Sequence, residues 1–217
     1  MVKICFDDDC HKIDDCIHCQ KNALIICFLI NFVMFALELF YGLRESSASL
    51  LGDAAHNSGD ALILGSSLFV MASTLKVKAK LALIKSFIML GFGFLTFYHV
   101  ALILYAGTVP HAETLTAVGA FALTGNIASA LLLMYYRNKD INLKSAYICC
   151  RNDVLASAGI IVAGILVMYT ASFWPDVIIG SLIGGLIVWS SIGIAKESLG
   201  VVRNSACLLY TSDAADE

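Results

Sequence analysis

Residues 23–43 read ALIICFLINFVMFALELFYGL, a run in which Glu38 is the one charged residue. A helix needs about 20 mostly apolar residues to cross the hydrocarbon core of a bilayer. The run is therefore long enough and apolar enough to be a transmembrane helix. The whole chain has the same character, because 59% of its 217 residues are hydrophobic and 14% are charged. In ordinary soluble domains about 45–50% of residues are hydrophobic and about 25% are charged.

Further apolar stretches of spanning length follow the first one. They are residues 49–74, 81–106, 113–136, 145–170 and 174–195. The connections between them are too short to contain a folded soluble domain. We therefore predict an all-α integral membrane protein in which residues 23–200 form a six-helix transmembrane domain within a lipid bilayer.

The basic residues predict the orientation of these helices. Eleven lysines and arginines fall before the first helix, after the last one, or in every second connection. On the opposite side of the predicted membrane only Arg44 appears. Because positive residues are enriched on the cytoplasmic side, both termini are predicted to be cytoplasmic. The formal net charge of −3 argues against a basic surface that binds nucleic acid, and we expect no nucleic-acid partner.

The last eleven residues, 207–217, read CLLYTSDAADE. This string resembles the in-frame translation of a transposase adapter used in DNA sequencing. We therefore expect residues 201–217 to be a truncated tail whose last part, 207–217, is adapter-derived, and we exclude that part from functional reasoning.

The second stretch contains polar residues at regular helical spacing. Residues 49–62 read SLLGDAAHNSGDAL, in which Asp53, His56 and Asp60 are three and four positions apart and share one helical face. An ionisable side chain within a span costs about 2.5–3.5 kcal/mol on insertion, so such residues are functional candidates. An imidazole and a carboxylate at this spacing can bind one divalent ion, although a buried pair that only holds helices together has the same spacing. Candidate accessory residues are Asp53, Asn57 and Glu38.

The fifth stretch contains a second polar group. Residues 145–159 read SAYICCRNDVLASAG, and Cys149 and Asp153 are again four positions apart on one face. Membrane cysteines also occur as simple packing residues, because cysteine behaves as a small hydrophobic side chain. A packing role does not explain an ionisable aspartate within a span, so we predict that the carboxylate of Asp153 is functional.

The two polar groups are predicted to lie at the same depth. Arg44 and Asp60 are separated by about 24 Å of helix, and Lys139 and Asp153 by about 21 Å, at 1.5 Å per residue. Helices two and five enter from opposite sides of the membrane. The sum of about 45 Å matches a bilayer with its headgroups, about 40–45 Å thick. Asp60 and Asp153 are therefore predicted to meet near the midplane, where transporter sites usually lie.

These residues resemble the cation diffusion facilitator family, which exports divalent metals, over about residues 22–200. The strongest part is SLLGDAAHNSGDA at residues 49–61, which is similar to the family's second-helix pattern with His-x-x-x-Asp. The segment WPDVIIGSLIGGLIV, which starts at Trp174, resembles the family's sixth helix. The CCRND sequence at residues 149–153 resembles the fifth helix of short relatives that end after the sixth helix. We therefore expect a short form without an evident C-terminal cytoplasmic domain, with a domain lost by truncation as the alternative.

The resemblance implies a tetrahedral transport site made by helices two and five. On this chain the first pair of ligands would be His56 and Asp60, and the second pair Cys149 and Asp153. The family usually has His or Asp where this chain has Cys149. The resemblance also implies a homodimer, and we expect it in a bacterial inner (plasma) membrane.

The first 22 residues are rich in possible metal ligands. Their Cys and His residues are Cys5, Cys10, His11, Cys16, His18 and Cys19, with five aspartates between them. The C-x-x-C spacing of Cys16 and Cys19 can chelate one soft ion. We interpret residues 1–22 as a cytoplasmic arm that folds around a metal ion, with a disordered acidic tail as the alternative.

Other polar and small residues within the spans favour structural interpretations. Asn126 is expected to hydrogen-bond to another helix, and Lys85 to extend its ammonium group toward the cytoplasmic surface. Gly180 and Gly184 are small enough to permit close helix packing.

We therefore hypothesise a secondary transporter that exports Zn²⁺, or else Cd²⁺ or Co²⁺, in exchange for protons. Imidazole, thiolate and carboxylate donors suit zinc, and protons compete with the metal for the same atoms. We expect no cofactor and no enzymatic activity, and the GxxxxGK[ST] pattern of an ATP-binding loop is absent from the chain. The alternatives are a membrane metal sensor that binds without transport, and a proton-coupled transporter of a non-metal substrate.

Overall fold

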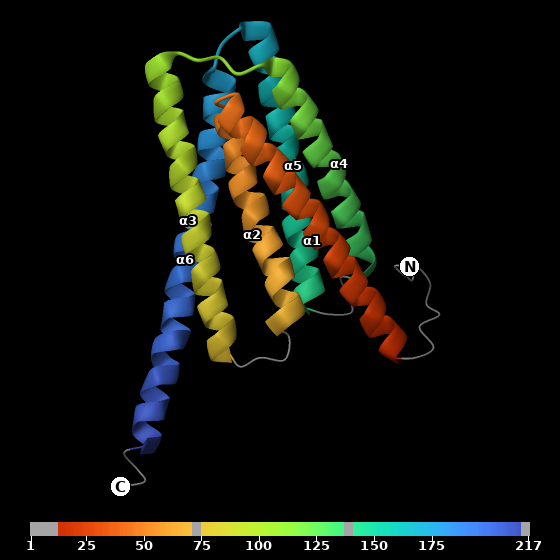
Figure 1. The fold of residues 1–217 in the computed structure, drawn as a ribbon, viewed down its shortest axis with the longest axis vertical. Coiled ribbons are helices and arrows are strands. Elements are labelled where there is room, and N and C mark those ends of the chain that lie inside the picture. Colours follow the sequence, from red (N-terminus) through yellow and green to blue (C-terminus); the bar gives the residue numbers. More distant parts are fainter. Residues whose placement is uncertain (1–12, 71–74, 137–140, 214–217) are drawn as a thin grey trace.

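The computed structural model describes residues 13–70, 75–136 and 141–213, and in these residues the chain is all-helical (Figure 1). The helices are α1 (Ile13–Arg44), α2 (Ala48–Val70), α3 (Leu75–Ala106), α4 (Ala112–Tyr136), α5 (Ile141–Thr170) and α6 (Trp174–Asp213). The all-α prediction is confirmed. Within the described residues, each predicted span falls on one of these helices, and several predicted ends, such as Ala106, Thr170 and Trp174, agree with the observed ends.

Successive helices run in opposite directions along the bundle (Figure 1). The short links between α1 and α2, α3 and α4, and α5 and α6 all lie at one end, at the top of the figure. We call this end of the bundle the link end. The last residue of α1, Arg44, lies there.

Two helices are longer than the sequence predicts. The helix α1 begins at Ile13, ten residues before the predicted span, so its first turns lie within the segment expected to be an arm. The helix α6 continues to Asp213, into the residues expected to be adapter-derived.

Five of the helices are long and apolar enough to cross a membrane. These candidate spans are Lys21–Arg44, Ala79–Ala106, Ala112–Tyr135, Tyr147–Thr170 and Trp174–Arg203. The helix α2 is not among them, because Asp53, His56, Asn57 and Asp60 lower its hydropathy.

The polar helix α2 is enclosed by the other helices. It contacts α1, α3, α5 and α6, and its residues Asp53, Asn57 and Asp60 are buried. The outer faces of the bundle instead carry large apolar side chains, and Leu155 and Trp189 are 72% and 82% exposed. A polar interior within an apolar surface is the distribution that a lipid environment requires, because buried polar groups must find partners inside the protein.

A carboxylate from α6 holds the first turn of α2. Asp176 is fully buried and accepts hydrogen bonds from the backbone N–H groups of Ala48 (2.7 Å) and Ser49 (3.1 Å) and from the hydroxyl of Ser47 (2.7 Å). The first N–H groups of a helix lack partners within the helix and carry partial positive charge. Asp176 therefore caps a helix that lies more than a hundred residues away in sequence.

Close packing of α6 on α2 makes this cap possible. A Cβ atom at Gly180 would collide with the backbone of Ala48. Only glycine permits the two helices to approach so closely at this point, which confirms the packing role predicted for Gly180. The cap and the close contact together fix the start of α2 against α6.

Replacing Asp176 by alanine is expected to destabilise the protein by about 1–3 kcal/mol, because the cap is lost and buried donors lose their acceptor. The measurement is the free energy of unfolding of the purified protein in detergent. Glu113→Ala, which removes an exposed carboxylate from the first turn of α4, is the matched control. Equal stability of the two variants would contradict this role of Asp176.

Candidate metal site between α2 and α5

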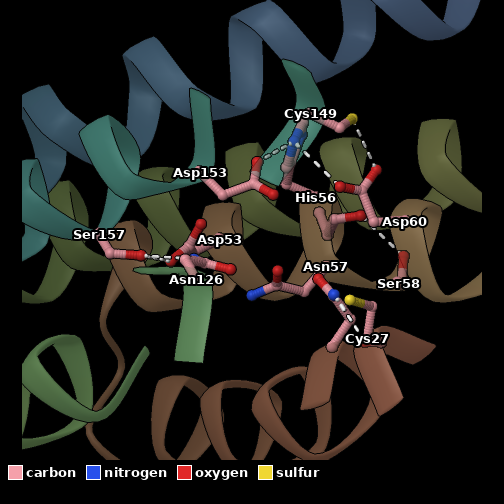
Figure 2. Close-up of polar contacts among 12 residues, drawn as sticks. Cys27, Asp53, His56, Asn57, Ser58, Asp60, Asn126, Cys149, Asp153 and Ser157 are labelled. Atoms are coloured by element: carbon pink, nitrogen blue, oxygen red, sulfur yellow. Dashed lines mark hydrogen bonds and ion pairs between the residues drawn. The ribbon is translucent and has the colours of Figure 1, made fainter. Parts of the chain in front are cut away.

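Four predicted ligands, two from α2 and two from α5, come together inside the bundle (Figure 2). The Nε2 atom of His56 lies 2.6 Å from Oδ1 of Asp153 and 4.0 Å from Oδ2 of Asp60. The thiol of Cys149 donates a hydrogen bond of 3.1 Å to Oδ1 of Asp60. We call these four residues the His56 cluster.

The spacing of four residues on each helix explains this convergence. One helical turn separates His56 from Asp60 and Cys149 from Asp153, so each pair lies on one face of its helix. The helices α2 and α5 are in contact, and the two polar faces meet there. The predicted meeting of Asp60 and Asp153 at one depth agrees with the contacts that both make with His56.

The distances in this cluster are close to those of a tetrahedral metal site. Zinc bonds of about 2.0–2.3 Å place neighbouring ligand atoms about 3.3–3.8 Å apart in a tetrahedron. Ligand atoms of His56, Asp60 and Cys149 all lie within 4.8 Å of one another. Asp153 contacts His56 at 2.6 Å but is not a member of this mutually close set of three.

The four residues of the cluster differ in exposure. The carboxylates of Asp60 and Asp153 are buried, whereas His56 and Cys149 are partly exposed. One oxygen each of Asp60 and Asp153, both named Oδ2, has no hydrogen-bond partner among the described residues. A cation that enters past the imidazole and the thiol would meet these oxygens.

The candidate accessory residues belong to a second polar cluster. Its members are Glu38, Asp53, Asn57, Asn126 and Ser157, and we call it the oxygen cluster because its free atoms are oxygens. Asp53 precedes Asp60 by two turns, which places the oxygen cluster about 10 Å closer to the link end. Among its contacts, the hydrogen bond of 3.0 Å from Asn126 to Ser157 confirms the interhelical role predicted for Asn126.

The position of the Lys85 side chain differs from the prediction. Its side chain is 9% exposed and lies inside the bundle, where it interacts electrostatically with Asp60 and Cys149. The expectation that it extends toward the cytoplasmic surface is not met, because the side chain is buried. The sequence does not predict that Lys85 is buried near this cluster, since its distance from α2 and α5 depends on how α3 packs.

The N-terminal ligands cannot be compared with the His56 cluster. Cys5, Cys10 and His11 lie outside the described residues. Cys16, His18 and Cys19 lie on α1, but their side chains are outside the described part of the chain. The metal-binding arm therefore stays a prediction.

Comparison with known protein families matches residues 24–201 to the cation efflux transmembrane domain. The chain belongs to the cation efflux family. The match covers all six helices, and it confirms the resemblance on which the ligand assignment rests. Members of this family are membrane transporters of metal cations and not enzymes.

Several bacterial members of the family are similar in sequence. The chain is 24% identical over 195 residues to the cation efflux system protein CzcD of Alcaligenes sp., covering 84% of this chain and 62% of the relative. It is 25% identical over 193 residues to the zinc transporter ZitB of Pectobacterium atrosepticum, covering 83% and 60%. It is 24% identical over 205 residues to the cadmium, cobalt and zinc/H(+)-K(+) antiporter of Bacillus subtilis, covering 84% and 63%. The chain thus spans about three fifths of the length of these relatives.

Proposed function

We propose that this protein exports Zn²⁺ from the cytoplasm in exchange for protons, with the His56 cluster as its transport site. The observation that supports the proposal best is the meeting of α2 and α5 at this point: ligand atoms of His56, Asp60 and Cys149 lie within 4.8 Å of one another, and Asp153 contacts His56 at 2.6 Å. The metal is the cargo, and no resident cofactor is needed.

The donor set favours a borderline or soft divalent ion. Zinc binds His nitrogen, Cys sulfur and carboxylate oxygen in tetrahedral sites. Magnesium and calcium prefer six or more oxygen ligands, and the cluster does not supply them. Cadmium and cobalt fit the same donors, and the names of the relatives include zinc, cadmium and cobalt.

Pairing within the cluster suggests how protons exchange with the metal. A protonated imidazole would pair with Asp153, and the thiol proton of Cys149 would lie on Asp60. A divalent ion needs the neutral imidazole and the thiolate, so its binding would displace these protons. Reloading from the opposite side would return protons and complete the exchange.

The proposal includes an orientation and a location. We propose that α2 spans the membrane as a sixth helix inside the other five, with both termini cytoplasmic and the link end outside. Basic residues are concentrated on the predicted cytoplasmic side, which supports this orientation. We further propose a homodimer in a bacterial inner membrane, as expected for a family whose similar members are bacterial.

Asp60→Ala and Asp153→Ala are each expected to abolish zinc tolerance in a bacterial host that lacks its own zinc exporters. Each change removes a buried carboxylate ligand that no neighbouring side chain replaces. The measurement is growth across zinc concentrations at matched expression, with Glu113→Ala as the control. Wild-type tolerance in either variant would contradict the assigned site.

Transport itself is tested with the purified chain in vesicles that contain a zinc-sensitive dye and a pH-sensitive dye. A pH gradient is expected to drive zinc movement, and zinc is expected to drive proton movement in the opposite direction. Tight zinc binding with neither movement would indicate a sensor. Proton movement without zinc binding would indicate a transporter of another substrate.

Cys149→Ser is expected to weaken cadmium transport more than zinc transport, because thiolate sulfur favours the softer ion. The measurement is the ratio of initial cadmium and zinc transport rates in the same vesicles. Cys150→Ser, which changes the neighbouring buried cysteine outside the cluster, is the matched control. An unchanged ratio in Cys149→Ser would show that Cys149 does not bind the transported ion.

A further inference from the structure

Lys85 is the one lysine or arginine that is buried among the described residues. Its neighbours on α3, Ile84 and Phe87, are 55% and 61% exposed, whereas Lys85 is 9% exposed. The side chain of Lys85 therefore lies on the inward face of a helix whose outer face is apolar. A lysine is almost never buried unless a negative charge compensates its own. The interior of the bundle must supply such a charge close to Lys85.

The packing of α3 on α2 places Lys85 beside Asp60. The side chain of Met89 fills the space over Gly59, where a Cβ atom would lie 2.6 Å from the Met89 sulfur. Lys85 precedes Met89 by four residues and therefore shares its face of α3. Because α2 and α3 run in opposite directions (Figure 1), one turn back along α3 corresponds to about one turn forward along α2. Lys85 thus faces α2 just beyond Gly59, where Asp60 lies, and it interacts electrostatically with Asp60 and Cys149.

Lys85 leaves the ligand atoms of Asp60 free. The ion pairs among the described residues do not include one between Lys85 and Asp60. Oδ1 of Asp60 accepts the hydrogen bond from the thiol of Cys149 (Figure 2), and Oδ2 has no hydrogen-bond partner within the described part of the chain. The ammonium group therefore acts on the carboxylate through its charge and does not occupy the oxygen that a metal ion would use.

The proposed zinc site has a net charge that needs compensation. Asp60, Asp153 and the thiolate of Cys149 are anionic donors, whereas the imidazole of His56 is neutral when it binds metal. A divalent ion held by these four donors therefore leaves a single negative charge. The metal-free site has the same excess, because a protonated imidazole balances one of the two carboxylates. A buried charge without a partner is costly.

We propose that Lys85 is a positioning residue for zinc, whose positive charge balances the negative charge that Cys149 adds to the site and so permits Cys149 to bind as a thiolate. The inference rests on the proposed function and deepens it. A neutral donor in place of Cys149 would give a zinc complex without net charge, and Lys85 would no longer be needed. Lys85 on α3 and Cys149 on α5 are therefore expected to act as a pair.

The test is the dissociation constant for zinc of the purified full chain in detergent, with serine in place of Cys5, Cys10, Cys16 and Cys19. Lys85→Met keeps an unbranched side chain and removes the charge. It is expected to weaken zinc binding about tenfold or more, because the compensating charge is lost. Lys85→Arg, which keeps the charge, is expected to retain the affinity. Lys80→Met, which removes an exposed lysine from the same helix, is the matched control.

A second measurement changes the donor that Lys85 compensates. Cys149→His and Cys149→Ser both remove the negative charge of the thiolate. Lys85→Met added to either change is therefore expected to leave the zinc affinity of that variant unchanged or to increase it. A lysine with only a structural role would cost the same affinity in all three backgrounds, because the effects of independent changes add.

Two further variants keep the test decisive if a protein does not fold. Lys85→Gln removes the same charge as Lys85→Met and leaves a polar side chain. The serine background replaces the histidine background if the larger imidazole does not fit on α5. The thermal unfolding midpoint of each variant shows that the compared proteins are folded.

Three results would overturn the pairing of Lys85 with Cys149. They are an unchanged zinc affinity in Lys85→Met, an equal loss of affinity in all three backgrounds, and tighter zinc binding in Lys85→Met, which would show that the ammonium group competes with the metal. Zinc binding that Asp60→Ala abolishes and Lys85→Met does not affect would leave the proposed transport site standing. Zinc binding that Asp60→Ala does not affect would overturn both the site and the role of Lys85.

Discussion

The rest of the structure depends on the burial of one polar helix. The helix α2 carries Asp53, His56, Asn57 and Asp60, and each ionisable group exposed to lipid would cost about 2.5–3.5 kcal/mol. The bundle avoids this cost by enclosing α2 within α1, α3, α5 and α6 and by turning apolar side chains outward. The buried carboxylate of Asp176, on α6, accepts hydrogen bonds from the free N–H groups in the first turn of α2. The helix that carries these polar residues thus lies at the centre of the domain.

Two clusters with different chemistry lie along this helix. Near the middle of α2, an imidazole and a thiol join two carboxylates, a donor set that suits zinc. Two turns earlier, Asp53 is buried with Glu38, Asn57 and Asn126, and one oxygen of each has no hydrogen-bond partner among the described residues. The donor set of the first arrangement suits a borderline metal. Because Asp53 and Asp60 belong to one rigid helix, any movement of α2 relative to α5 would change both clusters together.

Much of the fold and of the first cluster could be predicted from the sequence, because both depend on local periodicity. Apolar runs predict the helices, and the spacing of four residues predicts the pairs His56 with Asp60 and Cys149 with Asp153. Features that depend on contacts between distant segments could not be predicted. Sequence alone does not show that Asp176 caps α2, or that Lys85 is buried near Asp60. It also groups Glu38 and Asp53 with the metal ligands, because helical spacing gives the face of a residue and not its partners on other helices.

The central claim is that α2 and α5 hold one transported metal ion through His56, Asp60, Cys149 and Asp153. Zinc K-edge X-ray absorption tests it most directly, on the full chain with Cys5, Cys10, Cys16 and Cys19 replaced by serine and loaded with one equivalent of zinc. The account predicts one sulfur ligand at about 2.3 Å and nitrogen and oxygen ligands at about 2.0–2.2 Å. It also predicts that the sulfur ligand disappears in Cys149→Ser. Bound zinc without a sulfur ligand, or a sulfur ligand that persists in Cys149→Ser, would contradict the claim.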